Sequence, residues 1–74
     1  MKTQTIAVNG QTYRLTAEDG KIVAEQHNTE PALGAEWQAV ARAKFADGKI
    51  TSLRGMAWDN TELLAAADAL ALAA

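Results

Sequence analysis

The same tight turn occurs twice in this chain. Asp19-Gly20-Lys21-Ile22 and Asp47-Gly48-Lys49-Ile50 repeat one tetrapeptide, and alternating apolar and polar residues flank each copy. Asp-Gly between such runs is typical of a two-residue hairpin, because a type I′ turn needs positive φ at both central residues. Asn9-Gly10 is a further turn of this kind. The sequence therefore predicts a small antiparallel sheet built from hairpins.

The first half of the chain predicts a meander with strands at 3–8, 11–17 and 21–27. The turns between them place Arg14 opposite Glu25, an opposite-charge pair that contributes about 0.2–1 kcal/mol. The same register gathers one apolar face, which consists of Ile6, Val8, Tyr13, Leu15, Ala17, Ile22 and Ala24. Charge pairing and apolar alternation thus agree on the register.

Residues 35–46 are compatible with a strand or a helix. They contain good helix formers, yet apolar and polar positions alternate almost strictly and only Val40 breaks the pattern. Because a hairpin turn follows directly, we favour a strand that pairs with residues 49–58. Residues 28–34, which include the single proline and Leu33, are expected to form the preceding connection.

The register of the second hairpin makes a specific prediction about its large side chains. A two-residue turn places Phe45 opposite Ile50 and Trp37 opposite Trp58. Gly55 inside the second strand indicates a bulge or the close approach of another backbone. A chain so rich in alanine needs large side chains to fill its core, so we expect at least one tryptophan to be buried.

The C-terminal segment predicts a helix. Asp59 is its expected N-cap, and Glu62 three residues later completes a capping-box arrangement. Its apolar stripe consists of Leu63, Leu64, Ala67, Leu70 and Ala71. Leu72 lies on the opposite side. The predicted fold is therefore a single α+β domain over residues 1–74, with an antiparallel sheet of about five strands and one C-terminal helix packed on one face.

The composition argues against catalysis and metal binding. The chain has no cysteine and one histidine, His27, so thiolate chemistry, disulfides and the usual zinc sites are excluded. Apart from Glu25 on the same strand face, nothing that catalysis needs converges on His27. We therefore expect no enzymatic activity, no cofactor and no bound metal.

The charge distribution bears on the partner. The formal net charge of −2 argues against nucleic acid, for which a basic stripe is expected. Arg42, Lys44, Lys49 and Arg54 nevertheless form a basic cluster on the second hairpin. This cluster is either a phosphate contact or a solvated face that discourages edge aggregation, and we favour the second interpretation.

The chain shows no signal for secretion or membrane insertion. Lys2 is followed by polar residues, and the apolar tail at 63–74 is short and contains Asp68. Small secreted domains usually depend on disulfides, so the lack of cysteine favours a cytoplasmic location.

Two segments resemble a known family. Phe-Ala-Asp-Gly-Lys-Ile at 45–50 and Arg-Gly-Met-Ala-Trp-Asp at 54–59 resemble the final hairpin and closing helix of SnoaL/NTF2-like domains, over less than half of the chain. The resemblance implies the hairpin and, as one alternative function, a truncated ligand-binding domain. The N-terminal helices that wall the pocket of that family, and a catalytic Asp/His pair, have no counterpart here.

The expected function follows from the sheet surface that the single predicted helix leaves uncovered. One helix cannot cover both faces of such a sheet, which leaves area for a second copy, as a homodimer, or for another protein. The favoured hypothesis is a small acidic non-enzymatic protein–protein interaction module, similar in its general properties to phage or mobile-element inhibitors of host defence complexes such as anti-CRISPR proteins. A nucleic-acid-associated regulator that uses the basic hairpin is the alternative. The candidate interaction surface consists of Arg42, Lys44, Lys49, Arg54, Trp37, Trp58 and Leu72.

Overall fold

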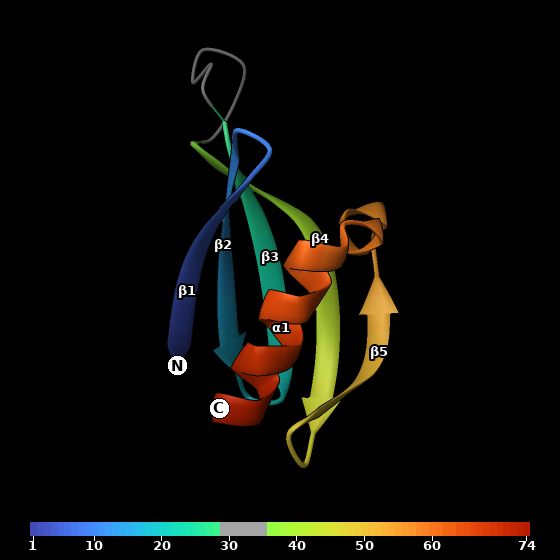
Figure 1. The fold of residues 1–74 in the computed structure, drawn as a ribbon. Helices are drawn as coiled ribbons and strands as arrows, with labels where there is room; N and C mark the ends of the chain where they lie inside the picture. Colours follow the sequence, from blue (N-terminus) through green and yellow to red (C-terminus); the bar gives the residue numbers. More distant parts are fainter. Residues whose placement is uncertain (29–35) are drawn as a thin grey trace.

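The computed structural model describes residues 1–28 and 36–74. Its elements, in order, are β1 (Lys2–Val8), β2 (Gln11–Glu18), β3 (Lys21–His27), β4 (Trp37–Ala46), β5 (Lys49–Arg54), the 3₁₀-helix η2 (Met56–Asp59) and α1 (Thr61–Ala73). The strands form one antiparallel sheet in the order β1-β2-β3-β4-β5, and α1 crosses one of its faces (Figure 1). This is the predicted α+β fold, and the ambiguous segment is a strand. The predicted connection at 28–34, including Leu33, lies outside the described residues except for Asn28.

Three type I′ turns set the registers of the hairpins. In each turn both central residues have positive φ, between 51° and 81°. The predicted pairing of Arg14 with Glu25 is confirmed, as is that of Phe45 with Ile50. Local turn chemistry therefore sets how each hairpin aligns next to its turn, and in the last hairpin the register shifts beyond Phe45.

A bulge in β4 inverts the alternation of its side chains. Ala41 faces Ala24 in β3, whereas Ala39 faces Glu25, so Val40 is the extra residue. Because side chains alternate with a period of two, one extra residue moves all preceding side chains to the opposite face. Trp37 and Ala39 therefore lie on the face opposite to the one that Ala41 helps to bury.

The predicted cross-strand pairing of Trp37 with Trp58 is wrong. Trp37 faces His27 of β3, and β5 ends at Arg54, so Trp58 lies in η2. Trp58 is nevertheless in the core, with 5% of its surface exposed, as expected for at least one tryptophan. Its Nε1 donates a hydrogen bond to the carbonyl oxygen of Arg42 at 3.0 Å, which ties η2 to β4.

Gly55 allows the chain to leave β5 and enter η2. Its φ is 102°, and a Cβ at this position would lie 2.7 Å from the carbonyl oxygen of Val40 and 2.9 Å from the Cα of Ala41. Of the two predicted alternatives, the close approach of another backbone is the one observed. Glycine is required here by both conformation and space.

The helix begins one residue later than predicted. Asn60, and not Asp59, is the N-cap: its Oδ1 accepts hydrogen bonds from the amides of Glu62 at 3.1 Å and Leu63 at 3.3 Å. Asp59 is already the last residue of η2, and Asn60 has the extended backbone that a cap needs.

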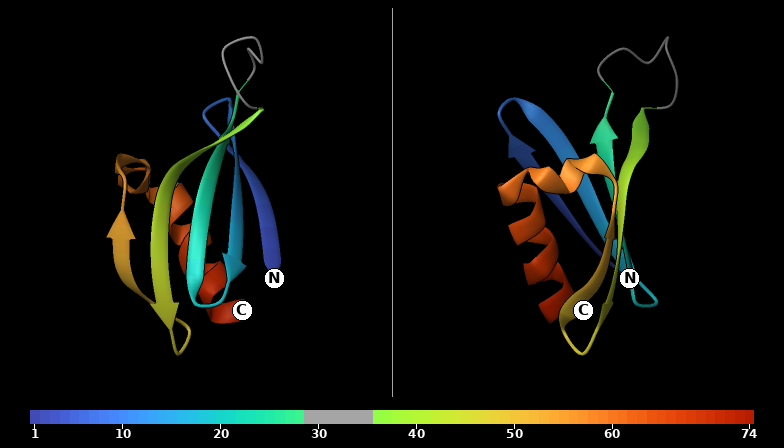
Figure 2. Two further views of the ribbon diagram at one scale, coloured as in Figure 1. Left: turned by 180° about the vertical axis from the view of Figure 1, so that it is seen from behind. Right: turned by 90° about the vertical axis from the view of Figure 1, so that its right-hand side faces the viewer.

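The core lies between α1 and the sheet (Figure 2, right). Its buried members are Leu15, Ala17, Ile22, Ala24, Ala41, Ala43, Trp58, Leu63, Ala67, Leu70 and Ala71. Many of these are alanines, so the helix and the sheet can approach closely. Leu64 is partly buried against this core, and Leu72 is exposed, as the predicted helix stripe requires.

Candidate functional site: the outer face of the sheet

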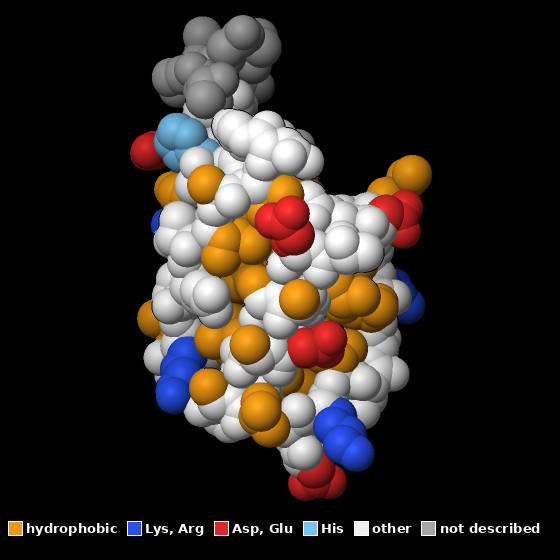
Figure 3. All heavy atoms as spheres, in the orientation of Figure 1, with side chains coloured by type: hydrophobic (Ala, Val, Ile, Leu, Met, Phe, Trp, Pro, Cys, Tyr) orange, Lys and Arg blue, Asp and Glu red, His pale blue; other side chains and the backbone are white. Residues whose placement is uncertain are grey.

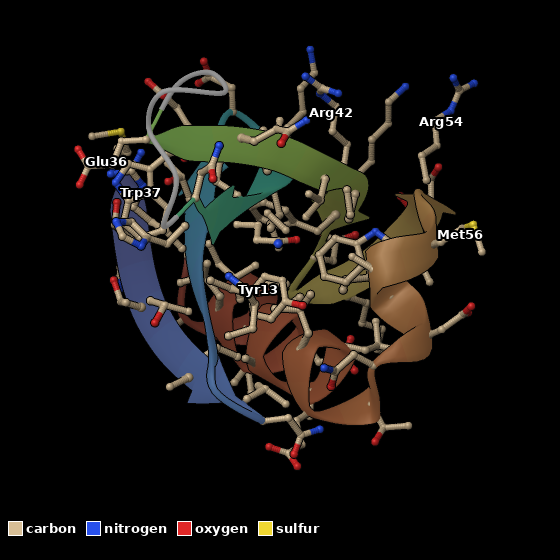
Figure 4. All side chains as sticks on the ribbon, turned by 90° about the horizontal axis from the view of Figure 1, so that it is seen from above. Tyr13, Glu36, Trp37, Arg42, Arg54 and Met56 are labelled. Carbon is tan, nitrogen blue, oxygen red and sulfur yellow. The ribbon has the colours of Figure 1, made fainter. Side chains whose placement is uncertain are left out.

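Most of the basic side chains lie on the face of the sheet turned away from α1, here called the outer face. Arg42 and Lys44 alternate with buried alanines of β4. Arg54 of β5 faces Arg42, and Lys21 of β3 faces Lys44. Figure 4 shows Arg42 and Arg54 pointing to the same side, away from α1, whereas Tyr13 points toward the helix. Three adjacent strands thus bring four cations together.

These four cations line an open groove of about 470 Å³. The groove is completed by Ile22, Val23, Ala43 and Ser52, and no carboxylate lines it. We call Lys21, Arg42, Lys44 and Arg54 the cationic groove. None of its members forms an ion pair with a described residue, and this includes Lys21, although Glu18 faces it across the hairpin.

The cationic groove contains two cross-strand pairs of like charge. Lys21 lies directly opposite Lys44, and Arg42 directly opposite Arg54. Like charges in such positions destabilise a sheet, whereas opposite charges stabilise it. A bound anion would remove this repulsion, so the arrangement favours anion binding over a purely structural role.

Trp37 belongs to a separate cluster on the outer face. The Arg14 guanidinium lies 4.3 Å from the centroid of the Trp37 ring, and it forms an ion pair with Glu25 at 3.0 Å. His27 meets the same ring edge-on with 4.9 Å between centroids, and its Nε2 lies 3.2 Å from Glu36 Oε1. Each charged group in this cluster therefore has a partner, unlike the cations of the groove.

The remaining predicted site residues are not brought together. Lys49 follows the last hairpin turn, faces Ala46 and does not line the groove. Trp58 is buried. Leu72 is 77% exposed on α1, and its Cδ1 would lie 3.3 Å from a Cβ at Gly48.

Lys21 is the member of the groove that sequence reasoning missed. Its relevant neighbour is Lys44, and that contact depends on the pairing of β3 with β4. No short turn specifies this pairing, because residues 28–36 separate the two strands. The only sequence signal was the position of Lys21 directly after a predicted turn, on the same face as Arg14.

The face that carries α1 differs in charge. The helix contributes Glu62 and Asp68, both exposed, and has no lysine or arginine. Figure 3, which views this face, shows acidic side chains among scattered apolar ones near the middle, with lysine or arginine side chains toward the margins. The helix therefore carries only negative charge and the cationic groove only positive charge, although the net charge is only −2.

The described part of the chain offers neither a metal site nor a membrane-spanning helix. Within residues 1–28 and 36–74, no group of three or more His, Asp or Glu side chains is placed to hold a metal ion. No helix in this part of the chain has the length and apolar character needed to cross a membrane. The chain matches no protein-family model, no curated protein and no solved structure. A functional proposal therefore depends on the geometry of the outer face.

Proposed function

We propose that this chain is a non-enzymatic protein–protein interaction module that binds an acidic protein surface through its cationic groove. The observation that carries the proposal is the placement of like charges opposite one another, as Arg42 with Arg54 and Lys21 with Lys44. These pairs reduce stability in the free protein, and carboxylates of a partner would neutralise them.

The groove is well suited to carboxylates. Arg42 and Arg54 are held on neighbouring strands, so their guanidinium groups start from fixed backbone positions. Guanidinium groups can bind Asp and Glu side chains with two parallel hydrogen bonds. Val23 and Ser52 add an apolar contact and a hydroxyl within the same groove. Rigid strands therefore present both charge and shape to a partner.

Two observations favour an acidic protein over nucleic acid. The net charge is −2 and the charged side chains of α1 are all acidic, so a long polyanion is repelled outside the groove. Single-stranded nucleic acids also stack on free aromatic faces, but Trp37, the aromatic residue on the outer face, is covered by Arg14. Inhibition of a host defence complex stays a prediction about which acidic protein is bound.

Binding to defined probes tests this proposal. We expect an oligoglutamate peptide, titrated into isotopically labelled protein, to shift the amide resonances of Lys21, Arg42, Lys44 and Arg54 at low salt. Arg54→Gln should weaken binding about two- to fivefold, since an exposed charge pair contributes ~0.5–1 kcal/mol. Lys49→Gln is the matched control, because it removes the same charge from the same strand outside the groove.

The outcomes separate the alternatives. Tighter binding of a single-stranded DNA oligonucleotide, with a steep decrease as salt is added, would favour the nucleic-acid-associated regulator. Equal weakening by Arg54→Gln and Lys49→Gln would mean that net charge alone attracts the peptide. Resonance shifts confined to α1 would move the binding surface to the opposite face. Each of these results contradicts the proposal.

A further inference from the structure

The two edges of the sheet are built differently. β1 and β5 each pair with one neighbouring strand only. In β5 the register shifts, because Lys44 faces Ser52 while Phe45 faces Ile50, which leaves Thr51 as an extra residue. Lysine and arginine occupy the two ends of β5 (Lys49–Arg54). Bulges and charged residues of this kind are the usual means by which proteins prevent edge strands from pairing.

The β1 edge has no bulge, and its charge is confined to one end. All seven residues of Lys2–Val8 pair with β2 without a register shift. The strand contains no proline and no glycine, and its one charged side chain is at its first residue. It is an edge strand of the sheet, next to β2 (Figure 1). A regular edge of this length, with no charged residue after its first, is a template for another strand.

The hairpin register shows which backbone groups of β1 are available. Val8 and Gln11 flank a two-residue turn, so they form a hydrogen-bonded pair, and such pairs alternate along the hairpin. Gln4 and Ile6 therefore bond to β2, whereas the N–H and C=O groups of Thr5 point away from it. Thr3 and Ala7 share this outward orientation, two residues to either side.

We propose that β1 pairs antiparallel with β1 of a second copy, about a two-fold axis at Thr5. In this register Thr5 faces Thr5 of the second copy, and Thr3 faces Ala7. Lys2 faces Val8, so no like charges meet, and Gln4 faces Ile6. The strand is thus complementary to itself in both backbone and side chains, which favours a second copy over an unrelated strand.

This pairing has a consequence for the outer face. A two-fold axis perpendicular to the sheet keeps both α1 helices on one side of the joined sheet and both outer faces on the other. The two cationic grooves, formed by β3, β4 and β5, then lie on one continuous surface. A partner with two acidic segments would bind such a dimer more tightly than the monomer. The pairing itself does not depend on the proposed function of the groove.

Sedimentation velocity over a range of protein concentrations tests the proposal. We expect a monomer–dimer equilibrium for the wild type. Thr5→Lys places two like charges at the two-fold axis and should raise the dissociation constant about two- to fivefold. Thr51→Lys, the same substitution on the opposite edge strand, should leave the equilibrium unchanged. Circular dichroism checks that both variants are folded.

Hydrogen exchange of the wild type supplies a readout that needs no variant. The amides of Thr3, Thr5 and Ala7 should become protected as protein concentration rises, whereas a free edge leaves them exchanging fast. A wild type that stays monomeric at millimolar concentration would overturn the proposal. So would a dimer that is insensitive to Thr5→Lys, or protection of these amides that does not vary with concentration.

Discussion

At the scale of single residues, the positions with local constraints were predictable and those with non-local constraints were not. Asn9-Gly10 and the two Asp-Gly pairs were recognised because their left-handed backbone is a property of the turn itself. The bulge at Val40 exists only relative to β3, so the sequence marked the break in alternation without explaining it. A glycine inside a predicted strand indicates a bulge or the close approach of another backbone, but only the fold shows that Gly55 approaches the backbone of Val40 and Ala41.

Two glycine substitutions separate conformation from space. Gly10 has a φ of 81°, and no atom lies within 4 Å of a Cβ built at this position. Gly10→Ala should therefore lower the free energy of unfolding only by the penalty of the left-handed backbone, about 1–2 kcal/mol. Gly55→Ala adds a contact of 2.7 Å with the carbonyl oxygen of Val40 and should cost about 3 kcal/mol or more. Urea denaturation measures both losses. Equal losses would show that β4 moves aside without strain.

At the scale of elements, the existence of each strand and of the helix was predictable, whereas some boundaries were not. The second hairpin was expected to run to residue 58, yet β5 ends at Arg54 and η2 follows. Asp59 is the last residue of this short helix, so Asn60 is the N-cap of α1. Both residues are good N-caps, so local preference alone could not decide between them. The hydrogen bond from Trp58 to β4 holds η2 in place, and the helix then begins after Asn60.

The cap assignment has a direct test. Asn60→Ala removes the side-chain oxygen that accepts hydrogen bonds from two amides at 3.1 and 3.3 Å, and we expect a loss of ~1 kcal/mol in the free energy of unfolding. Asp59→Ala, the matched control on the preceding residue, should cost much less, because Asp59 caps nothing. Thermal denaturation followed by circular dichroism compares the two. If Asp59→Ala lowered the free energy of unfolding more than Asn60→Ala, Asp59 would be the N-cap, as the sequence predicts.

The two faces of α1 should respond oppositely to the same charge. Leu70 is 6% exposed and Leu72 is 77% exposed. Leu70→Glu buries an unpaired carboxylate and should unfold the protein, whereas Leu72→Glu should leave the circular dichroism spectrum unchanged. Light scattering on the same samples reports association. If Leu72→Glu dissociated a wild-type dimer, the interface would lie on α1 and not on β1.

At the scale of the whole molecule, the net charge of −2 conceals a basic groove on the outer face. The sequence showed basic residues on the second hairpin, and the expected alternation placed Arg42 and Lys44 on one side of it. The groove itself was not predictable, because it needs Lys21 from the first half of the chain opposite Lys44 from the second. An α+β fold follows from local patterns, whereas a surface assembled from β3, β4 and β5 follows from their pairing.

If the cationic groove is kept for binding, removing its repulsion should make the protein more stable and less able to bind. Arg54→Glu converts the pair with Arg42 from like to opposite charge, and we expect the free energy of unfolding to rise by about 0.2–1 kcal/mol at low salt. The gain should shrink in molar salt, which screens charges on the surface. Lys49→Glu makes the same charge change on the same strand but faces Ala46, so it should give no comparable gain. Urea denaturation at both ionic strengths measures these differences.

A loss of stability in Arg54→Glu that does not depend on salt would mean that Arg42 and Arg54 do not repel each other. The case for an anionic partner would then lose its physical basis.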